Sequence, residues 1–459
     1  MKAQTETAQL VHDLNSPVNG VHEYNYELLM EYEPKPIPLF VPDNGAEQKE
    51  LFLRGDIENP QHMYSGLDKL DFDQMYQGLH VEAATITKSA AISPKYKDAY
   101  TGVIDDFMKK TEFLRAAYDY KHATTAEDRA EASQRYMDLN IDLYRKPDEA
   151  IYRSMLAGKL RVIDAKHLTG RAAELREELH AILPERQHDE GALSRFKPSE
   201  ETIAWMQEVV KSLYGNLLQH VPDQDKFTVY EIRDLFNQII DEEFGESASG
   251  WKTVVQTATS FNVRVPEKEI IIPVTYPDKT YAQVRKLIVH EIGVHMPRSL
   301  MGEQTDADPL RHGVAGSYDS EEGLGVVMEQ ALEGKYIENG MPSYIVAGAA
   351  YYDNMDFRQL FEMEWRISLL ENLSSDDISD GQIDKKRSAI YNIVFRIMRG
   401  SDDLPWFKDL AYFNGANDIW KHLESISGDD TEFAFVLASG KTNPANKDDR
   451  RLAREVRTP

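Results

Sequence analysis

Residues 290–295 read His290-Glu291-Ile292-Gly293-Val294-His295, and an acidic pair, Glu321-Glu322, follows after a short segment. Catalytic zinc is held by imidazole nitrogens and carboxylate oxygens at about 2.0–2.2 Å, with one position left open for water. A glutamate beside a histidine ligand is placed to accept a proton from that water. The two stretches are therefore typical of a zinc hydrolase, with Glu291 as the general base.

The spacing of the two histidines predicts an irregular helix. Zinc helices commonly carry their histidines at i and i+4, whereas His290 and His295 stand at i and i+5. On an ideal helix five residues rotate by about 140° and four by only about 40°, so these side chains would point apart. A π-turn of about 4.4 residues restores their convergence. We therefore expect a π-bulge between them, where Gly293 lowers the steric cost.

A third metal ligand is expected from the segment after the hexapeptide. Glu322 is the stronger candidate, and His312, between the hexapeptide and the acidic pair, is the alternative. The run from Asp319 to Glu322 also has the form of a helix start, with Asp319 as N-cap and Glu322 completing a capping box. Such a cap positions a ligand well. The other interpretation is that both histidines are ordinary helix residues, one packed and one exposed.

The composition of the chain excludes several kinds of site and partner. Its 459 residues include no cysteine, which excludes a disulfide framework, a cysteine-ligated metal and a cysteine nucleophile. The formal net charge of −26 argues against nucleic acid and anionic membranes as partners. The polar N-terminus has no signal-peptide pattern, and no apolar run is long enough to span a membrane. We therefore expect a cytoplasmic protein that binds neither nucleic acid nor a membrane.

Hydrophobic periodicity predicts a mainly α fold with a small β-hairpin or sheet. Apolar residues recur at helical spacing in four long stretches, over 96–182, 200–219, 357–372 and 385–399. The period changes to two over 261–265 and 269–274, which predicts the hairpin. Three segments are expected, namely a mixed N-terminal segment (1–95), a helical region (96–190) and a catalytic region (191–459).

The order of hairpin followed by zinc helix has a functional interpretation. An edge strand beside such a helix can hold an extended peptide by strand addition. The alternative is that the hairpin only covers the hydrophobic core.

The motifs resemble those of the MATCAP-like tyrosine carboxypeptidase family, whose bacterial relatives share a QEGLA-type motif. Besides the hexapeptide and Glu321–Leu324, the landmarks include Trp251, Lys408–Gly415 and Ala438–Lys441. The resemblance covers about 160–441 of the chain. It implies a helical, zincin-like metallopeptidase with a HExxxH active-site helix and one Zn²⁺ per chain. Such enzymes remove a C-terminal residue, which is tyrosine in the eukaryotic case.

Matched residue by residue, the resemblance implies that His290, His295 and Glu322 are the zinc ligands. It also implies that Glu291 is the catalytic glutamate. The chain departs from the family pattern at Gly325, where the motif usually has alanine. Because both residues are small, we expect the helix packing to survive and no ligand to be affected.

A carboxypeptidase also needs a cation for the terminal carboxylate of its substrate. The resemblance makes Arg396, Arg399 and Lys408 the candidates, and the alternative for each is an ordinary solvated cation. Tyr318 and His312 lie near the acidic pair in the sequence and are candidate donors to the oxyanion. Sequence proximity alone favours a purely structural role for both.

The sequence thus predicts a zinc-dependent carboxypeptidase that removes a C-terminal residue, tyrosine or another aromatic, from a peptide or protein. One alternative is an exopeptidase like dipeptidyl peptidase III, whose second motif continues differently from Gly323–Val326. The other alternative is a non-catalytic helical binding protein stabilised by zinc. Cobalt or manganese could also occupy ligands of this type.

Overall fold

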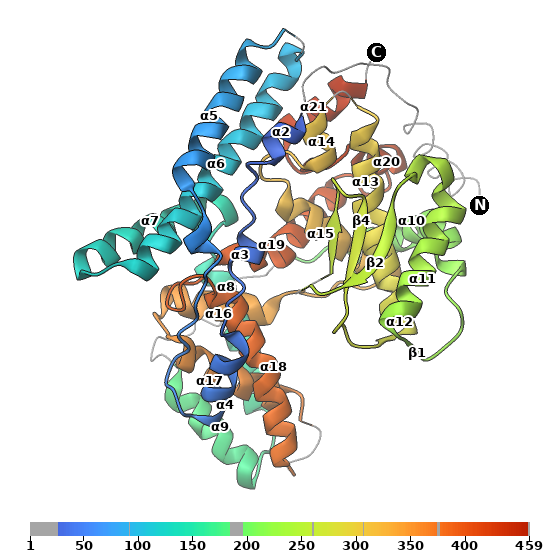
Figure 1. The fold of residues 1–459 in the computed structure, drawn as a ribbon. Coiled ribbons are helices and arrows are strands. Elements are labelled where there is room, and N and C mark those ends of the chain that lie inside the picture. The colour runs from blue at the N-terminus through green and yellow to red at the C-terminus, as the bar shows by residue number, and fades with distance from the viewer. Residues whose placement is uncertain are drawn as a thin grey trace.

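The computed structural model describes residues 26–90, 92–183, 196–258, 261–305, 307–373 and 377–457 (Figure 1). Helices dominate and a small sheet accompanies them, which confirms the predicted fold class. No helix within these ranges is both long and apolar enough to cross a membrane.

The N-terminal part is a series of helices joined by short connections. They are α2 (Tyr26–Met30), α3 (Pro36–Leu39), α4 (Gly45–Arg54), η1 (Leu67–Lys69), α5 (Phe72–Lys88), α6 (Pro94–His122), α7 (Ala126–Tyr144), α8 (Glu149–Asp164) and α9 (Gly170–Ile182). Side-chain caps begin α5, α7 and α8, because Asp71, Thr125 and Asp148 each accept a hydrogen bond from a backbone N–H three residues later. The long helix α6 packs against both α5 and α7, at the upper left of Figure 1.

Of the helices that follow, the first pack around the sheet and later ones pack against the helices of the N-terminal part. They are α10 (Glu200–Gln219), α11 (Val229–Ile239), η2 (Ile240–Phe244), η3 (Gly245–Ala248), α12 (Tyr281–Leu287), η4 (Ile288–His295), α13 (Met296–Glu303), α14 (Asp308–His312), α15 (Tyr318–Glu333), α16 (Met341–Tyr352), α17 (Phe357–Glu371), α18 (Asp380–Met398), η5 (Phe407–Leu410), α19 (Ala411–Ser425), α20 (Asp430–Ala438) and α21 (Lys447–Arg457). Of these, η2 and η4 are π-helices.

The sheet has three strands in the order β2-β4-β3. The strands β3 (Asn262–Arg264) and β4 (Glu269–Pro273) are antiparallel, which confirms the predicted hairpin. The third strand, β2 (Lys252–Gln256), pairs with β4 in parallel and was not predicted. A two-stranded ribbon of β1 (Lys226–Phe227) and β5 (Lys279–Thr280) leads into α12. The edge strands of the main sheet are therefore β2 and β3.

One sheet edge is already occupied. The side chain of Asn237 in α11 accepts a hydrogen bond from the Thr253 backbone N–H at 2.7 Å and donates one to the Thr253 carbonyl at 3.1 Å. This amide thus acts as a neighbouring strand would act on β2. Within the described residues, the pairing of β3 is with β4 alone.

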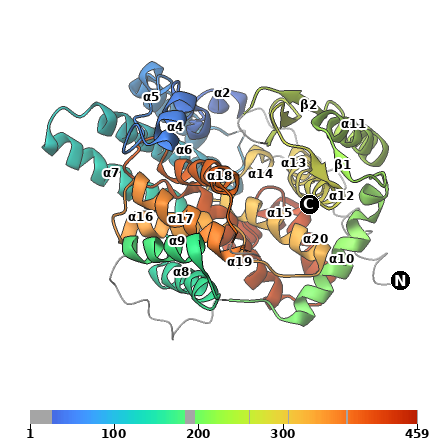
Figure 2. The same cartoon turned by 90° about the horizontal axis from the view of Figure 1, so that it is seen from below.

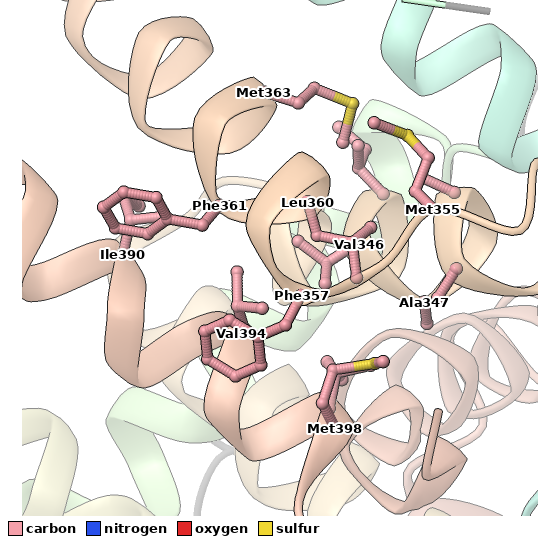
Figure 3. Packing of buried hydrophobic residues seen from close by; sticks show 14 of the residues in the cluster. Val346, Ala347, Met355, Phe357, Leu360, Phe361, Met363, Ile390, Val394 and Met398 are labelled. Carbon is pink, nitrogen blue, oxygen red and sulfur yellow. The ribbon is translucent and has the colours of Figure 1, made fainter. Parts of the chain in front are cut away.

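The largest hydrophobic core joins segments that are far apart in the sequence. Helices α8 and α9 pack against α16 and α17, and Figure 2 shows these elements together with α18. Phe357 and Leu360 of α17 and Val394 of α18 belong to this core (Figure 3). The core also includes Phe40 and Phe113, so it takes residues from all three predicted segments. The division of the chain at 95 and 190 remains a prediction.

A second core holds the elements that carry the histidine motif. It includes residues of α10, α11, β4, η4, α15, α19 and α20. Ile270 and Ile272 of β4 are fully buried in it, as are Ile288 and Ile292 of η4. The motif helix η4 is therefore packed between α10 and α15, in the same core as β4.

A buried carboxyl group in α17 makes the stability of this fold depend on pH. Glu364 is 2% exposed, and one of its oxygens has no hydrogen-bond partner within the described residues. Burial raises the pKa of Glu364 from 4.5 to about 8, and Lys159 opposes this only in part. Between these two pKa values the folded chain binds a proton that the unfolded chain has released. The raised pKa of Glu364 therefore adds to the free energy of unfolding. This contribution is fully present below about pH 4.5 and is lost as pH rises through about 8.

We expect Glu364→Gln to stabilise the protein at pH 8 and to have little effect at pH 5. The amide cannot ionise, so the variant avoids a cost of about 4 kcal/mol at the higher pH. Thermal unfolding followed by circular dichroism, with a chelator present, measures the difference. Glu362→Gln is the control on the same helix, because hydrogen bonds from Trp365 and Arg366 outweigh burial and lower the pKa of Glu362. Equal melting differences at pH 5 and pH 8 for Glu364→Gln would contradict the expectation.

Candidate metal centre

The two histidines lie in a π-helix. The helix begins as α12, with a capping box between Thr280 and Gln283, and then widens into η4 over Ile288–His295 before α13 continues it. Tyr214 of α10 donates a hydrogen bond from its hydroxyl to the carbonyl of Gly293 at 3.0 Å. A Cβ on Gly293 would lie only 2.8 Å from the Tyr214 ring, so this close approach requires glycine. The predicted π-turn is confirmed, and it extends over all eight residues of η4.

The π-helix brings the two histidine side chains together. Their ring centroids are 4.7 Å apart, and both residues are buried. Helix α15 adds Glu322, whose Oε2 lies 3.9 Å from the His290 Nε2. One ligand atom from each of His290, His295 and Glu322 lies within 4.8 Å of the other two. In the described part of the chain this is the group of histidine and acidic side chains that is arranged to hold a metal ion.

The arrangement fits Zn²⁺. Ligand atoms at about 2.0–2.2 Å from a tetrahedral ion lie about 3.3–3.6 Å from one another, so modest side-chain rotations would close the set. His312, the alternative third ligand, is outside this group. Its ring instead lies 5.0 Å from the ring of Tyr26, and burial lowers its pKa to about 3.

The predicted cap of α15 is wrong. The helix begins at Tyr318 with Ser317 as its N-cap, so Asp319 is its second residue and Glu322 its fifth. Asp319 does not cap the helix because its carboxylate pairs with Arg145, whose Nε lies 3.1 Å from Oδ2. Glu322 is positioned by the packing of α15 and not by a capping box.

Each histidine is held from behind by a second carboxylate. The His290 Nδ1 lies 2.6 Å from Oε1 of Glu329, and the His295 Nδ1 lies 3.1 Å from Oε1 of Glu321. Glu321 also accepts a hydrogen bond from Nε of Arg298 at 2.8 Å. Carboxylates in this position keep the proton on Nδ1 and leave Nε2 for a metal. Sequence reasoning missed these roles, although Glu329 follows Glu322 by seven residues and so shares its helix face.

The match to a known family covers the whole centre. The family model of the microtubule-associated tyrosine carboxypeptidase matches residues 204–449. The chain belongs to this family. A search of the curated proteins finds no match. The matched range contains the π-helix, Glu322 and the landmarks at 408–415 and 438–441, which agrees with the resemblance deduced from the sequence.

The charges around the tyrosine carboxypeptidase motif are strongly coupled. Burial lowers the pKa of His290, but the hydrogen bond with Glu329 and the charges of nearby glutamates outweigh it and raise this pKa to about 10. Burial alone would raise the pKa of Glu321, but Arg298 and His295 lower it to about 2. Burial raises the pKa of Glu291, against the nearby histidines. The centre therefore gathers several negative charges, as a site for a divalent cation should.

Two glycines fix the position of the helix that carries Glu322. A Cβ on Gly323 would lie 2.1 Å from the backbone of Gly415 in α19, and one on Gly415 would lie 1.8 Å from the Asp319 carbonyl oxygen. Helices α15 and α19 therefore touch backbone to backbone. Neither glycine can accept a side chain unless the helices separate.

Gly325 contradicts the expectation that its departure from the family motif leaves the ligands unaffected. A Cβ at this position would lie 2.5 Å from the Nε2 of His290. In this chain the imidazole ring of His290, a candidate ligand, occupies the space that a Cβ at position 325 would take. An alanine here would have to displace that ring.

The three cations predicted to bind substrate lie around one buried carboxylate. Asp409 accepts a hydrogen bond from Nε of Arg396 at 2.7 Å, and Nζ of Lys408 lies 3.7 Å from it. Arg399 stacks its guanidinium on the ring of Trp406. Burial would raise the pKa of Asp409, but Lys408, Arg396 and Arg399 hold it at about 2. Arg396 and Lys408 thus already have partners, whereas Arg399 has only the Trp406 ring, and its buried Nε has no hydrogen-bond partner within the described residues.

Lys408 connects this cluster to the metal centre. Its ammonium donates a hydrogen bond to the hydroxyl of Tyr318, which lies one helical turn before Glu322. Tyr412 of α19 is hydrogen-bonded to Tyr318, and the charge of Glu322 is the largest cause that raises the pKa of Tyr412. Two neutral phenol groups therefore lie beside Glu322. Tyr412 was not predicted, although it lies within the landmark at 408–415.

Proposed function

We propose that this protein is a zinc-dependent carboxypeptidase that removes a C-terminal residue, tyrosine or another aromatic, from a peptide or protein. The observation that carries the proposal is the convergence of His290, His295 and Glu322 beside Glu291. A carboxylate behind each histidine supports a metal role for both rings. Membership of the tyrosine carboxypeptidase family supports the type of reaction.

The proposed mechanism gives each residue one task. Zinc, when bound, supplies a Lewis acid that polarises the scissile carbonyl and activates water. Glu291 accepts the proton of the attacking water and delivers it to the nitrogen of the leaving amine. Glu291 is buried, so its carboxylate works in a medium of low dielectric constant, where proton transfer partners interact strongly.

Tyr412, which accepts a hydrogen bond from Tyr318, is the proposed donor to the oxyanion. Both hydroxyls lie beside Glu322, and burial and nearby acidic groups keep both phenols protonated, with their pKa values raised. Lys408 donates to the Tyr318 oxygen and Tyr318 donates in turn to Tyr412, which leaves the Tyr412 proton to be donated onward. Donors that are fixed before the reaction stabilise developing negative charge most effectively.

The open edge of the sheet is a proposed site for the extended part of the substrate. Strand β3 is paired on one side only in the described residues, whereas Asn237 occupies the edge of β2. The ring centroid of Phe261, next to β3, lies 5.7 Å from that of Tyr276, with the two rings tilted, and burial and then the charge of Glu291 raise the pKa of Tyr276. A peptide added to β3 would thus run toward the general base.

Metal content and product analysis test the proposal. The protein purified without added metal should contain about one zinc per chain by elemental mass spectrometry. Incubated with peptides that end in different residues, it should release one residue from the C-terminus, fastest for an aromatic residue, as mass spectrometry of the products records. Release of two residues from the N-terminus would indicate a dipeptidyl peptidase instead. Bound zinc without any cleavage would indicate a stabilised binding protein.

A further inference from the structure

The backbone of Lys441 is held by hydrogen bonds, and the carbonyl of the next residue, Thr442, accepts from Arg298, the partner of Glu321. Lys441 lies just after the end of α20. Its backbone N–H donates to the Leu310 carbonyl at 2.7 Å, and its carbonyl accepts from the Val314 N–H at 3.1 Å. The preceding Gly440 has φ +68°, and a Cβ there would lie 2.8 Å from the Leu310 oxygen, so this turn requires glycine. Figure 1 shows α14 and α20 close to α13 and α15.

The surroundings of Lys441 are acidic. Its ammonium interacts electrostatically with Glu321, Glu322 and Glu291. Of these three, Glu321 has the strongest electrostatic effect on Lys441. Its carboxylate is already hydrogen-bonded to Arg298 and to His295. Arg298 in turn has further partners in the carbonyls of Val436 and Thr442.

No hydrogen bond or ion pair of the Lys441 ammonium occurs within the described residues, although its side chain is partly buried. A cation removed from water at a cost is usually balanced by a bound anion. Arg396 and Lys408 are engaged by Asp409 and Tyr318. The Nε of Arg399 has no hydrogen-bond partner in the described residues, but this side chain lies over the Trp406 ring and interacts with the charge of Asp409, not with the glutamates of the centre. Of these four cations, Lys441 is thus the one that has no hydrogen bond or ion pair in this part of the chain and whose charge partners include the carboxylates of the centre.

We propose that Lys441 binds the terminal carboxylate of the substrate. This inference rests on the proposed carboxypeptidase function and names its recognition residue. In a C-terminal residue the carboxylate and the leaving nitrogen are attached to the same Cα atom. The cation that binds this carboxylate must therefore lie near the group that protonates that nitrogen, which is Glu291. Of the cations around the centre, Lys441 has both Glu291 and Glu322 among its main electrostatic partners.

The test compares a tyrosine-ended peptide that has a free carboxylate with the same peptide ending in an amide. For the wild type we expect much higher kcat/KM with the free carboxylate. Lys441→Met should lower that kcat/KM by about 10–100-fold, the usual worth of a hydrogen bond to a charged group, and leave cleavage of the amide unchanged. Lys441→Arg should recover part of the loss. Lys268→Met is the matched control, because Lys268 pairs with Glu303 and should leave both rates unchanged.

A binding measurement removes the dependence on turnover. In the Glu291→Gln background, titration calorimetry should show the free-carboxylate peptide binding about 10–100-fold more weakly when Lys441 is methionine. Zinc content should be equal in both proteins. Cleavage by the wild type together with unchanged discrimination in Lys441→Met would overturn the role of Lys441 alone. Absence of any cleavage by the wild type would overturn the proposed function, and the role of Lys441 with it.

Discussion

Replacing Glu291 with glutamine should lower kcat for peptide cleavage by about 10²–10⁴-fold, the usual contribution of a general base. Glutamine has nearly the same size and shape but accepts no proton at neutral pH. Because Glu291 is not one of the three converging ligand residues, zinc should remain bound. Peptide turnover and elemental mass spectrometry on the same preparation measure both quantities.

Glu303→Gln is the matched control for this experiment. Glu303 lies on α13, the continuation of the motif helix, and pairs with Lys268 and Arg311 away from the converging ligands. We expect its turnover to stay near that of the wild type. Full activity in Glu291→Gln would contradict the role of Glu291 as base, and loss of zinc together with activity would make it a structural residue instead.

Removing the third ligand should have the second large effect. Glu322→Ala leaves only His290 and His295 from the converging group, so zinc affinity should fall by more than about 100-fold, beyond the 10–100-fold typical of residues behind the ligands. Competition with a chromophoric chelator measures the affinity. Turnover at low zinc should disappear with it.

Glu333→Gln tests whether such losses come from the helix rather than the ligand. Glu333 is on the same helix, α15, and pairs with Lys286 and Lys335 at its other end. This variant should bind zinc as the wild type does. Unchanged affinity in Glu322→Ala would return His312 to consideration as the third ligand.

Local rules predicted the histidine helix well. The i, i+5 spacing of His290 and His295 can converge only if the helix widens, and the structure contains the π-helix that this requires. The hairpin also follows from local alternation, because Val263 and Ile270 pair across one short turn. Both predictions depend on contacts between residues that are near in sequence.

The remaining features depend on contacts that no local pattern contains. Arg145 binds the carboxylate of Asp319 although it lies 174 positions away in the sequence, and Asp319 therefore does not form the expected cap of α15. Lys441 reaches the centre only because its backbone pairs with Leu310 and Val314. The parallel strand β2 was missed because its partner β4 follows it by more than a dozen residues.

The π-helix η4 amounts to one residue inserted into an α-helix. Deleting Ile292 would give the commoner spacing of four and return the segment to α-helical register, with both histidines still on one face. Five residues at about 4.4 per turn rotate by about 409° and four at 3.6 per turn by about 400°, so everything after the deletion would keep its orientation to within about 10°. Arg298 would stay on the side of Glu321, to which it now donates at 2.8 Å. The widened turns therefore absorb the extra residue within η4, and an evolutionary path between the two motif lengths can leave α13 and the support of His295 in place.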